Sequence, residues 1–106
     1  MRHLFAIIVI AAALASPAQA TVYVAVSDAS QLSFQLSGDG RVYLRNVNAF
    51  DSNALGCCYS YWIDTTTQEG KNAFAVILSY SAMQRGFRFA INDYTTAQQI
   101  AWVGPW

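Results

Sequence analysis

The only thiols of this 106-residue chain belong to two adjacent cysteines, Cys57 and Cys58. Neighbouring Cα atoms lie about 3.8 Å apart across a trans peptide, which is below the separation of about 4.4–6.8 Å that disulfides usually span. A bond between these two residues would therefore be strained and relatively easy to reduce. Two buried free thiols and a bridge to another chain are the alternatives. A dithiol redox enzyme would need a Cys-x-x-Cys spacing and a basic neighbour, and the chain has neither.

The remaining polar residues offer little for catalysis or metal binding. The one histidine, His3, lies in an N-terminal leader, so the segment after the leader has no imidazole base and no further Cys or His ligand for zinc. Asp28, Asp39, Asp51 and Asp93 stand in turn-like contexts, where aspartate bonds the local backbone. We therefore expect no catalytic residue, no metal ion and no cofactor.

Aromatic and polar residues near two predicted strands form a candidate binding site. Tyr43 and Trp62 face away from the apolar stripes of their strands, and Arg45 shares the face of Tyr43. Asp64 and Thr65 precede a predicted helix, whose N-terminal N–H groups attract anions. Aromatic rings can stack on the apolar faces of sugars while such polar neighbours hold hydroxyl groups. These five residues are the predicted ligand-binding set.

Structural roles are the alternative for the same residue types. Asp64 and the threonines after it could serve only to cap the helix. Four further aromatic residues could belong to the core or to a subunit interface: Tyr59, Tyr61, Tyr80 and Trp102.

Residues 1–20 have the three parts of a secretory signal peptide. Arg2 and His3 precede an apolar run over residues 4–14, and Ala18-Gln19-Ala20 supplies an Ala-x-Ala cleavage pattern. The run is shorter than the roughly 20 residues that span a bilayer, so we expect cleavage, no membrane span afterwards, and a secreted or periplasmic bacterial protein. Such compartments favour disulfides.

Charge excludes one class of partner. Removing Arg2 leaves five basic against six acidic side chains in residues 21–106. Nucleic-acid binding depends largely on neutralising phosphates, so a nearly neutral chain predicts no nucleic-acid partner.

Alternating apolar and polar residues predict short strands at 22–26, 32–36, 41–47, 57–64, 87–91 and 100–103. In the fourth of these, Tyr59, Tyr61 and Ile63 share one face. The Asp39-Gly40 pair predicts a hairpin turn between the second and third.

A helix is predicted from Thr66 or Thr67 to about residue 85. Residues 66–69 read TTQE, which fits a capping box, and Gly86 fits a C-terminal cap. Apolar residues widen its stripe beyond one face, so we expect one side of the helix to meet the sheet and the other side to meet something besides water.

Several segments resemble a known family. Residues 58–67 read CYSYWIDTTT and lead into GKNA at 70–73, while SAMQRG at 81–86 precedes FRFAI at 87–91. The pattern resembles small exported bacterial proteins related to the binding subunit of subtilase cytotoxin, over roughly residues 21–104. The resemblance implies an OB-type fold, with the helix between the third and fourth strands. In the toxin, the subunit forms a pentameric ring and binds sialylated glycans, whereas many relatives have no toxin partner.

Two departures limit what the resemblance carries over. In the family, one cysteine before the helix usually pairs with another between the last two strands, but residues 92–99 contain no cysteine. The sugar-contacting residues of the toxin find no individual matches, so the resemblance assigns no site residue.

We therefore expect a signal peptide at 1–20 and a single α+β domain at 21–106. Its predicted form is a small, mostly antiparallel OB-like β-barrel of five to six strands, with one helix (about 67–85) between the third and fourth core strands. The expected function is that of an exported, non-enzymatic binding module resembling a toxin B subunit, which binds glycans and self-associates, as a pentamer by resemblance. The alternative is a periplasmic or secreted structural or inhibitory protein that binds another exported protein.

Overall fold

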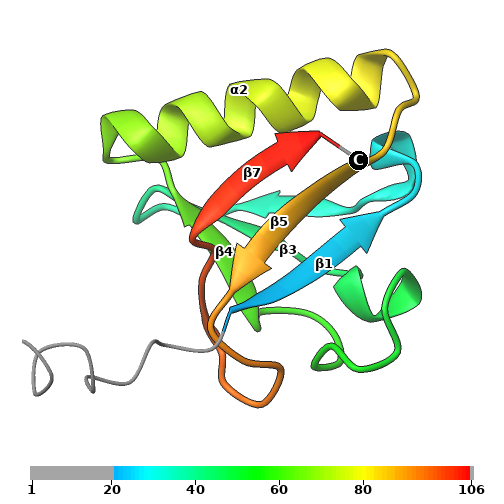
Figure 1. Cartoon of the computed structure of the whole chain (residues 1–106). Coiled ribbons are helices and arrows are strands. Elements are labelled where there is room, and N and C mark those ends of the chain that lie inside the picture. Colours follow the sequence, from blue (N-terminus) through cyan, green and yellow to red (C-terminus); the bar gives the residue numbers. More distant parts are fainter. Residues whose placement is uncertain (1–20, 106) are drawn as a thin grey trace, which may run out of the picture.

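The computed structural model describes residues 21–105, in which four strands precede and three follow one α-helix (Figure 1). The predicted signal peptide, residues 1–20, lies outside the described residues. The elements in chain order are β1 (Val22–Val26), a 3-10 turn η1 (Ala29–Gln31), β2 (Phe34–Leu36), β3 (Arg41–Leu44), a second 3-10 turn η2 (Val47–Ala49), β4 (Tyr61–Asp64), α2 (Gln68–Ala82), β5 (Phe87–Ile91), β6 (Gln98–Gln99) and β7 (Trp102–Pro105).

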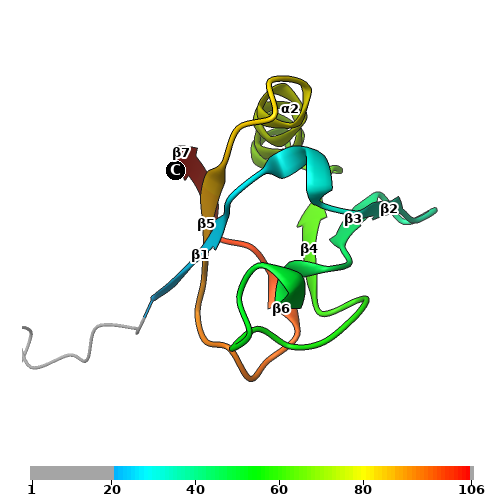
Figure 2. The ribbon, with the colours of Figure 1, turned by 90° about the vertical axis from the view of Figure 1, so that its right-hand side faces the viewer.

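The strands form two sheets that face each other. One sheet has the order β1-β5-β7 and is antiparallel throughout, and the other has the order β2-β3-β4-β6, in which only β4 and β6 run parallel. Figure 2 shows the two sheets side by side, with α2 lying over one end of the space between them. The predicted α+β class and the mostly antiparallel pairing are confirmed.

Two details of the predicted architecture are wrong. The described residues contain seven strands rather than five or six, because the polar pair Gln98–Gln99, which has no alternation to reveal it, pairs with β4 as β6. Four strands precede the helix, in the four places where alternation predicts them, and not three core strands as the resemblance implies; β1 and β2, which η1 separates, lie in different sheets. The strands pair as two separate sheets, and no pairing closes them into one barrel within residues 21–105.

The core fills the space between the sheets and under the helix. Its largest fully buried side chains come from both sheets, from α2 and from η2: Tyr61, Phe87, Phe89, Leu44, Ile63, Ile77, Ile91, Val24, Val26, Val42 and Val47. Each such burial stabilises the fold by roughly 1.5–3 kcal/mol relative to exposure. The strands that alternation predicts at 22–26, 41–47 and 87–91 bury their apolar residues at Val24, Val26, Val42, Leu44, Phe87, Phe89 and Ile91. Within residues 21–105, no helix is long and apolar enough to cross a bilayer.

The buried Tyr61 hydroxyl joins the loop before β4 to the loop between β5 and β6. It accepts the Leu55 N–H at 2.9 Å and donates to the Tyr94 carbonyl oxygen at 3.4 Å. The Tyr94 hydroxyl in turn donates to Asp51 Oδ2 at 2.8 Å. Because a buried polar group without a partner is destabilising, these bonds let an aromatic residue with a hydroxyl group occupy the core.

The helix starts where the chain folds tightly back on the end of β4. Thr67 is the N-cap residue, and its hydroxyl accepts the Gly70 N–H at 3.0 Å. The predicted capping box forms only in this half, because the third residue after the cap is Gly70 and not Glu69. A Cβ at position 70 would lie 1.7 Å from the Asp64 carbonyl oxygen, so the contact requires glycine.

The helix ends earlier than predicted. It stops at Ala82 rather than Arg85, and Gln84 takes a left-handed conformation with φ 55°. The Arg85 N–H donates to the Tyr80 carbonyl oxygen at 2.9 Å, which is the bond of a Schellman ending. The cap therefore depends on Gln84 and not on the predicted Gly86.

Gly86 has a packing role instead. A Cβ there would lie 2.8 Å from the carbonyl oxygens of both Val26 and Ser27. A side chain would therefore separate the start of β5 from the end of β1.

We expect Gly70→Ala to destabilise the protein by about 1–3 kcal/mol in urea unfolding, because the new methyl group would overlap the Asp64 carbonyl oxygen. Helix propensity alone would favour alanine by about 1 kcal/mol, so a loss identifies the contact as the cause. Gly38→Ala is the matched control, since nothing lies within 4 Å of its Cβ position. Equal stability of the two variants would contradict the tight turn.

Gln84→Gly should stabilise the protein by about 1 kcal/mol, because glycine has no side-chain penalty in the left-handed region. Gly86→Ala should shift the urea midpoint in the opposite direction, since it crowds the end of β1. If Gly86 were the cap, the Gln84 substitution would bring no gain.

Candidate functional site

Four side chains form a row across the outer face of the larger sheet. Strand register pairs Gln35 with Tyr43, Tyr43 with Trp62, and Trp62 with Gln99. Laterally paired residues point to the same face of a sheet, and the inward neighbours of Tyr43 and Trp62 are buried in the core. The row therefore places two aromatic rings between two amide side chains on the outside of the molecule.

A third aromatic ring reaches this face from the loop before β4. The Tyr59 ring lies 5.1 Å from the Tyr43 ring in an edge-to-face arrangement, and the Tyr43 and Trp62 rings are 6.1 Å apart. The Tyr59 hydroxyl donates to Gln35 Oε1 at 3.2 Å. We call Tyr43, Tyr59 and Trp62 the aromatic patch.

The position of Tyr59 corrects the prediction that it faces inward with Tyr61 and Ile63. Its side chain is 53% exposed, whereas those two residues are buried. Strand pairing begins only at Tyr61, so the alternation that places Tyr61 and Ile63 inward does not extend back to residue 59.

Two arginines lie against the aromatic patch. The Arg41 guanidinium lies 4.4 Å from the centre of the Trp62 ring, and that of Arg45 lies 5.6 Å from the centre of the Tyr59 ring. Such cation–π contacts stabilise by about 0.5–1 kcal/mol at exposed sites. The Nε atom of Arg45 is buried without a hydrogen-bond partner, and the guanidinium lies beside the Tyr59 ring.

Three of the five predicted site residues, Tyr43, Trp62 and Arg45, lie in or directly against the patch. Tyr59 and Arg41, which were not in the predicted site, contact them: the Tyr59 ring lies against the Tyr43 ring, and the Arg41 guanidinium lies over the Trp62 ring. Arg41 stands two residues before Tyr43 and so shares its face, which is a signal that the sequence contains. No sequence signal places Tyr59 there.

Asp64 and Thr65 serve mainly the turn between β4 and α2. Asp64 Oδ1 accepts the Thr66 N–H at 2.9 Å and the Thr66 hydroxyl at 2.6 Å, while the Thr65 hydroxyl donates to the Gly40 carbonyl oxygen. Asp64 is also the strand partner of Arg41, so it borders the patch. Its Oδ1 atom is nevertheless used by the two hydrogen bonds from Thr66.

The charged groups at this border stay ionised at neutral pH. The hydrogen bonds from the Thr66 side chain and backbone lower the pKa of Asp64 below its ordinary value. Interaction with the Tyr43 side chain raises the pKa of the Arg41 guanidinium. Asp64 and Arg41 therefore both stay ionised at neutral pH.

The structure bonds the sulfur atoms of Cys57 and Cys58 to each other, one of the three states that the sequence leaves open, and the peptide between them is cis. Cys57 is exposed and Cys58 is half-buried. The disulfide stands directly before Tyr59 in the chain.

A second aromatic pair lies on the other sheet. The Tyr23 and Trp102 rings are 5.5 Å apart, and the two side chains are 52% and 42% exposed. A groove of about 260 Å³ runs beside them between α2 and β7, lined by Ala73, Val76 and Val103 among others. Trp102 is thus not a core residue, and of the two structural roles considered for it, a place in a subunit interface remains.

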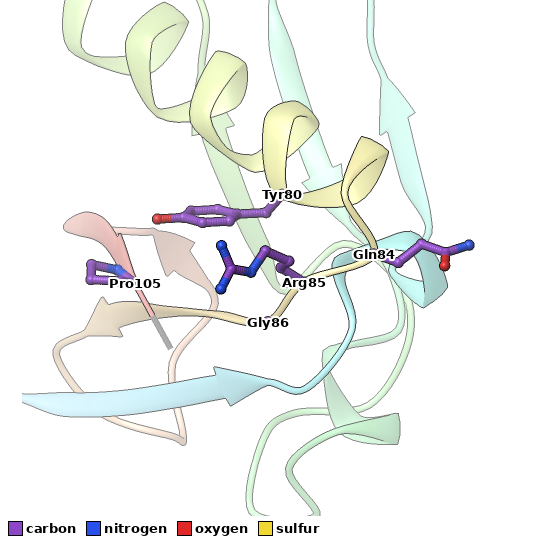
Figure 3. Close-up of a pocket in the computed structure, with 5 residues that line it drawn as sticks. All are labelled: Tyr80, Gln84, Arg85, Gly86 and Pro105. Carbon is purple, nitrogen blue, oxygen red and sulfur yellow. The ribbon is translucent and has the colours of Figure 1, made fainter.

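A cavity of about 450 Å³ lies under the end of α2 (Figure 3). The Tyr80 ring lies over the Arg85 side chain, and Pro105 stands across from both. Among the described residues that line it, Arg85 is the only charged one, and none carries a thiol, a carboxylate or a serine or threonine hydroxyl. Among the described residues, no group of three His, Cys, Asp or Glu side chains could hold a metal ion.

Comparisons of the chain with protein-family models, with curated proteins and with solved structures returned no match.

We expect Asp64→Asn to destabilise the protein at pH 7 and the difference from the wild type to shrink as the pH falls. The folded-state pKa of Asp64 is lowered, so its ionised form stabilises the fold above the unfolded pKa of about 3.9. This contribution is lost as the pH falls through the lower, folded value. Urea midpoints between pH 7 and pH 2.5 measure the effect.

Thr66→Val, which removes the hydroxyl donor, is the companion variant and should reduce the same pH dependence. A difference between wild type and Asp64→Asn that is constant over this range would contradict the role of the carboxylate.

Proposed function

We propose that the protein is an exported, non-enzymatic binding module that recognises glycans with the aromatic patch. The observation that carries the proposal is the row Gln35, Tyr43, Trp62 and Gln99, to which Tyr59 adds a third ring. Aromatic rings supply apolar faces for stacking, and amide groups both donate and accept hydrogen bonds, as sugar hydroxyls require.

The length of the row favours an oligosaccharide over a single sugar. Neighbouring strands lie about 4.8 Å apart, so four paired residues span three such intervals, about 14 Å. Gln99 at one end is exposed and Gln35 at the other is half-buried. A chain of sugar rings lying across the strands would meet an amide at each end and aromatic rings between them.

Arg41 occupies the ring surface that such a ligand would use. Its contact with Trp62 is joined by a weak ion pair with Asp39, at 3.8 Å between Nε and Oδ2. Both interactions are exposed and contribute little individually. A ligand can therefore displace the guanidinium from the ring and accept hydrogen bonds from its N–H groups.

A binding role agrees with how the aspartates are used. Asp28, Asp39, Asp51, Asp64 and Asp93 each accept hydrogen bonds from residues two positions away. Carboxylates held in this way stabilise turns. The signal-like leader supports export to the periplasm or beyond, and the resemblance supports an OB-like form of the two-sheet fold.

A second candidate function is binding to another exported protein, and the exposed Tyr23–Trp102 pair with its neighbouring groove favours it. The same surface would also serve self-association, for which the resemblance implies a pentamer. Native mass spectrometry of the processed protein distinguishes a monomer from an oligomer.

We expect Trp62→Ala to lower binding to immobilised oligosaccharides by about tenfold or more, since loss of a central aromatic contact commonly removes at least that much affinity. Trp102→Ala is the control, because it removes an exposed tryptophan from the other sheet, whereas Trp62 is half-buried. Circular dichroism verifies that both variants are folded.

No signal above background from folded wild-type protein on a broad glycan array would overturn the glycan proposal. Equal losses in the two tryptophan variants would show that the aromatic patch is not the binding surface.

A further inference from the structure

We propose that the Cys57–Cys58 disulfide is a redox switch for the aromatic patch. In the disulfide form, Tyr59 stays packed on Tyr43, and on reduction Tyr59 leaves the patch and ligand affinity falls. The inference rests on the glycan-binding function proposed above and names a regulation of that site.

The disulfide lies in the short segment that delivers Tyr59 to the patch. At one end of this segment, the Leu55 N–H donates to the buried Tyr61 hydroxyl at 2.9 Å. Strand β4 begins at Tyr61, and between these anchors the backbone is irregular. Within the segment the Ser60 hydroxyl donates to the Gly56 carbonyl oxygen at 3.2 Å. The disulfide is the only covalent cross-link in the segment.

Tyr59 is held on the patch by weak contacts. These are the edge contact with the Tyr43 ring, one hydrogen bond to Gln35 and the neighbouring Arg45 guanidinium. The Tyr59 side chain is 53% exposed, so its contacts compete with water. Ordering a flexible segment opposes them through lost conformational entropy. A covalent ring immediately before Tyr59 removes part of that entropy in advance.

The disulfide is accessible to a reductant, because Cys57 is exposed. The co-reactant is a dithiol, whose first thiolate attacks one sulfur of the pair and forms a mixed disulfide. Its second thiolate then releases the protein. The protein gains two electrons and two protons as two thiols, and the dithiol becomes a disulfide.

The test compares the oxidised protein with the same protein in excess dithiothreitol. NMR spectra without ligand follow the nuclear Overhauser contacts between the Tyr43 and Tyr59 rings, and an immobilised oligosaccharide array reports binding. We expect reduction to abolish the ring contacts and to lower array binding by about tenfold. Because the disulfide closes only a minimal loop, the unfolding midpoint should change little.

Variants separate the switch from loss of the fold. The double variant Cys57→Ser, Cys58→Ser should bind like the reduced protein, and dithiothreitol should not change its array binding. Tyr59→Ala should bind weakly in both states, whereas Trp102→Ala should keep the redox response.

Persistence of the Tyr43–Tyr59 contacts in the reduced protein, equal binding in both states, or two free thiols in protein purified without reductant would each overturn the switch. A wild-type protein that loses the ring contacts on reduction but binds no oligosaccharide would support the coupling and overturn the glycan function, so the two failures are distinguishable.

Discussion

The burial of Val42 and Leu44 on β3, and of Tyr61 and Ile63 on β4, is the constraint on which the outer surface depends. Successive side chains of a strand point to opposite faces, so fixing these four inward forces Tyr43 and Trp62 outward. Strand register then places the two rings side by side between Gln35 and Gln99. The hydrophobic core and the proposed binding surface are therefore two faces of one arrangement.

Two close backbone contacts set the helix against this core. The start of α2 lies against the Asp64 carbonyl oxygen at Gly70, and the chain after α2 lies against the end of β1 at Gly86. The intervening helix buries Ile77 and packs Ala73, Phe74 and Tyr80 on the core. Its other apolar side chains remain exposed, and Val76 among them lines the groove beside Trp102.

The two exposed aromatic surfaces differ in how they are built. The Tyr23–Trp102 pair stands on paired strands of the smaller sheet. The aromatic patch combines two residues on strands with one from an irregular loop that carries the disulfide. A surface that depends on a loop is easier to modulate than one built on strands alone. This contrast is why the proposed regulation concerns the aromatic patch.

Local pattern alone determined the α+β class, the inward faces of β1, β3 and β5, and the outward placement of Tyr43, Arg45 and Trp62, because alternation is a property of neighbouring residues. Only the tertiary structure decided the rest. The two-residue β6 exists through its pairing with β4, Gly86 packs against the end of β1 rather than capping the helix, and Tyr59 reaches Tyr43 only through the folding of its loop. Each of these depends on contacts between segments distant in the chain, which no local pattern encodes.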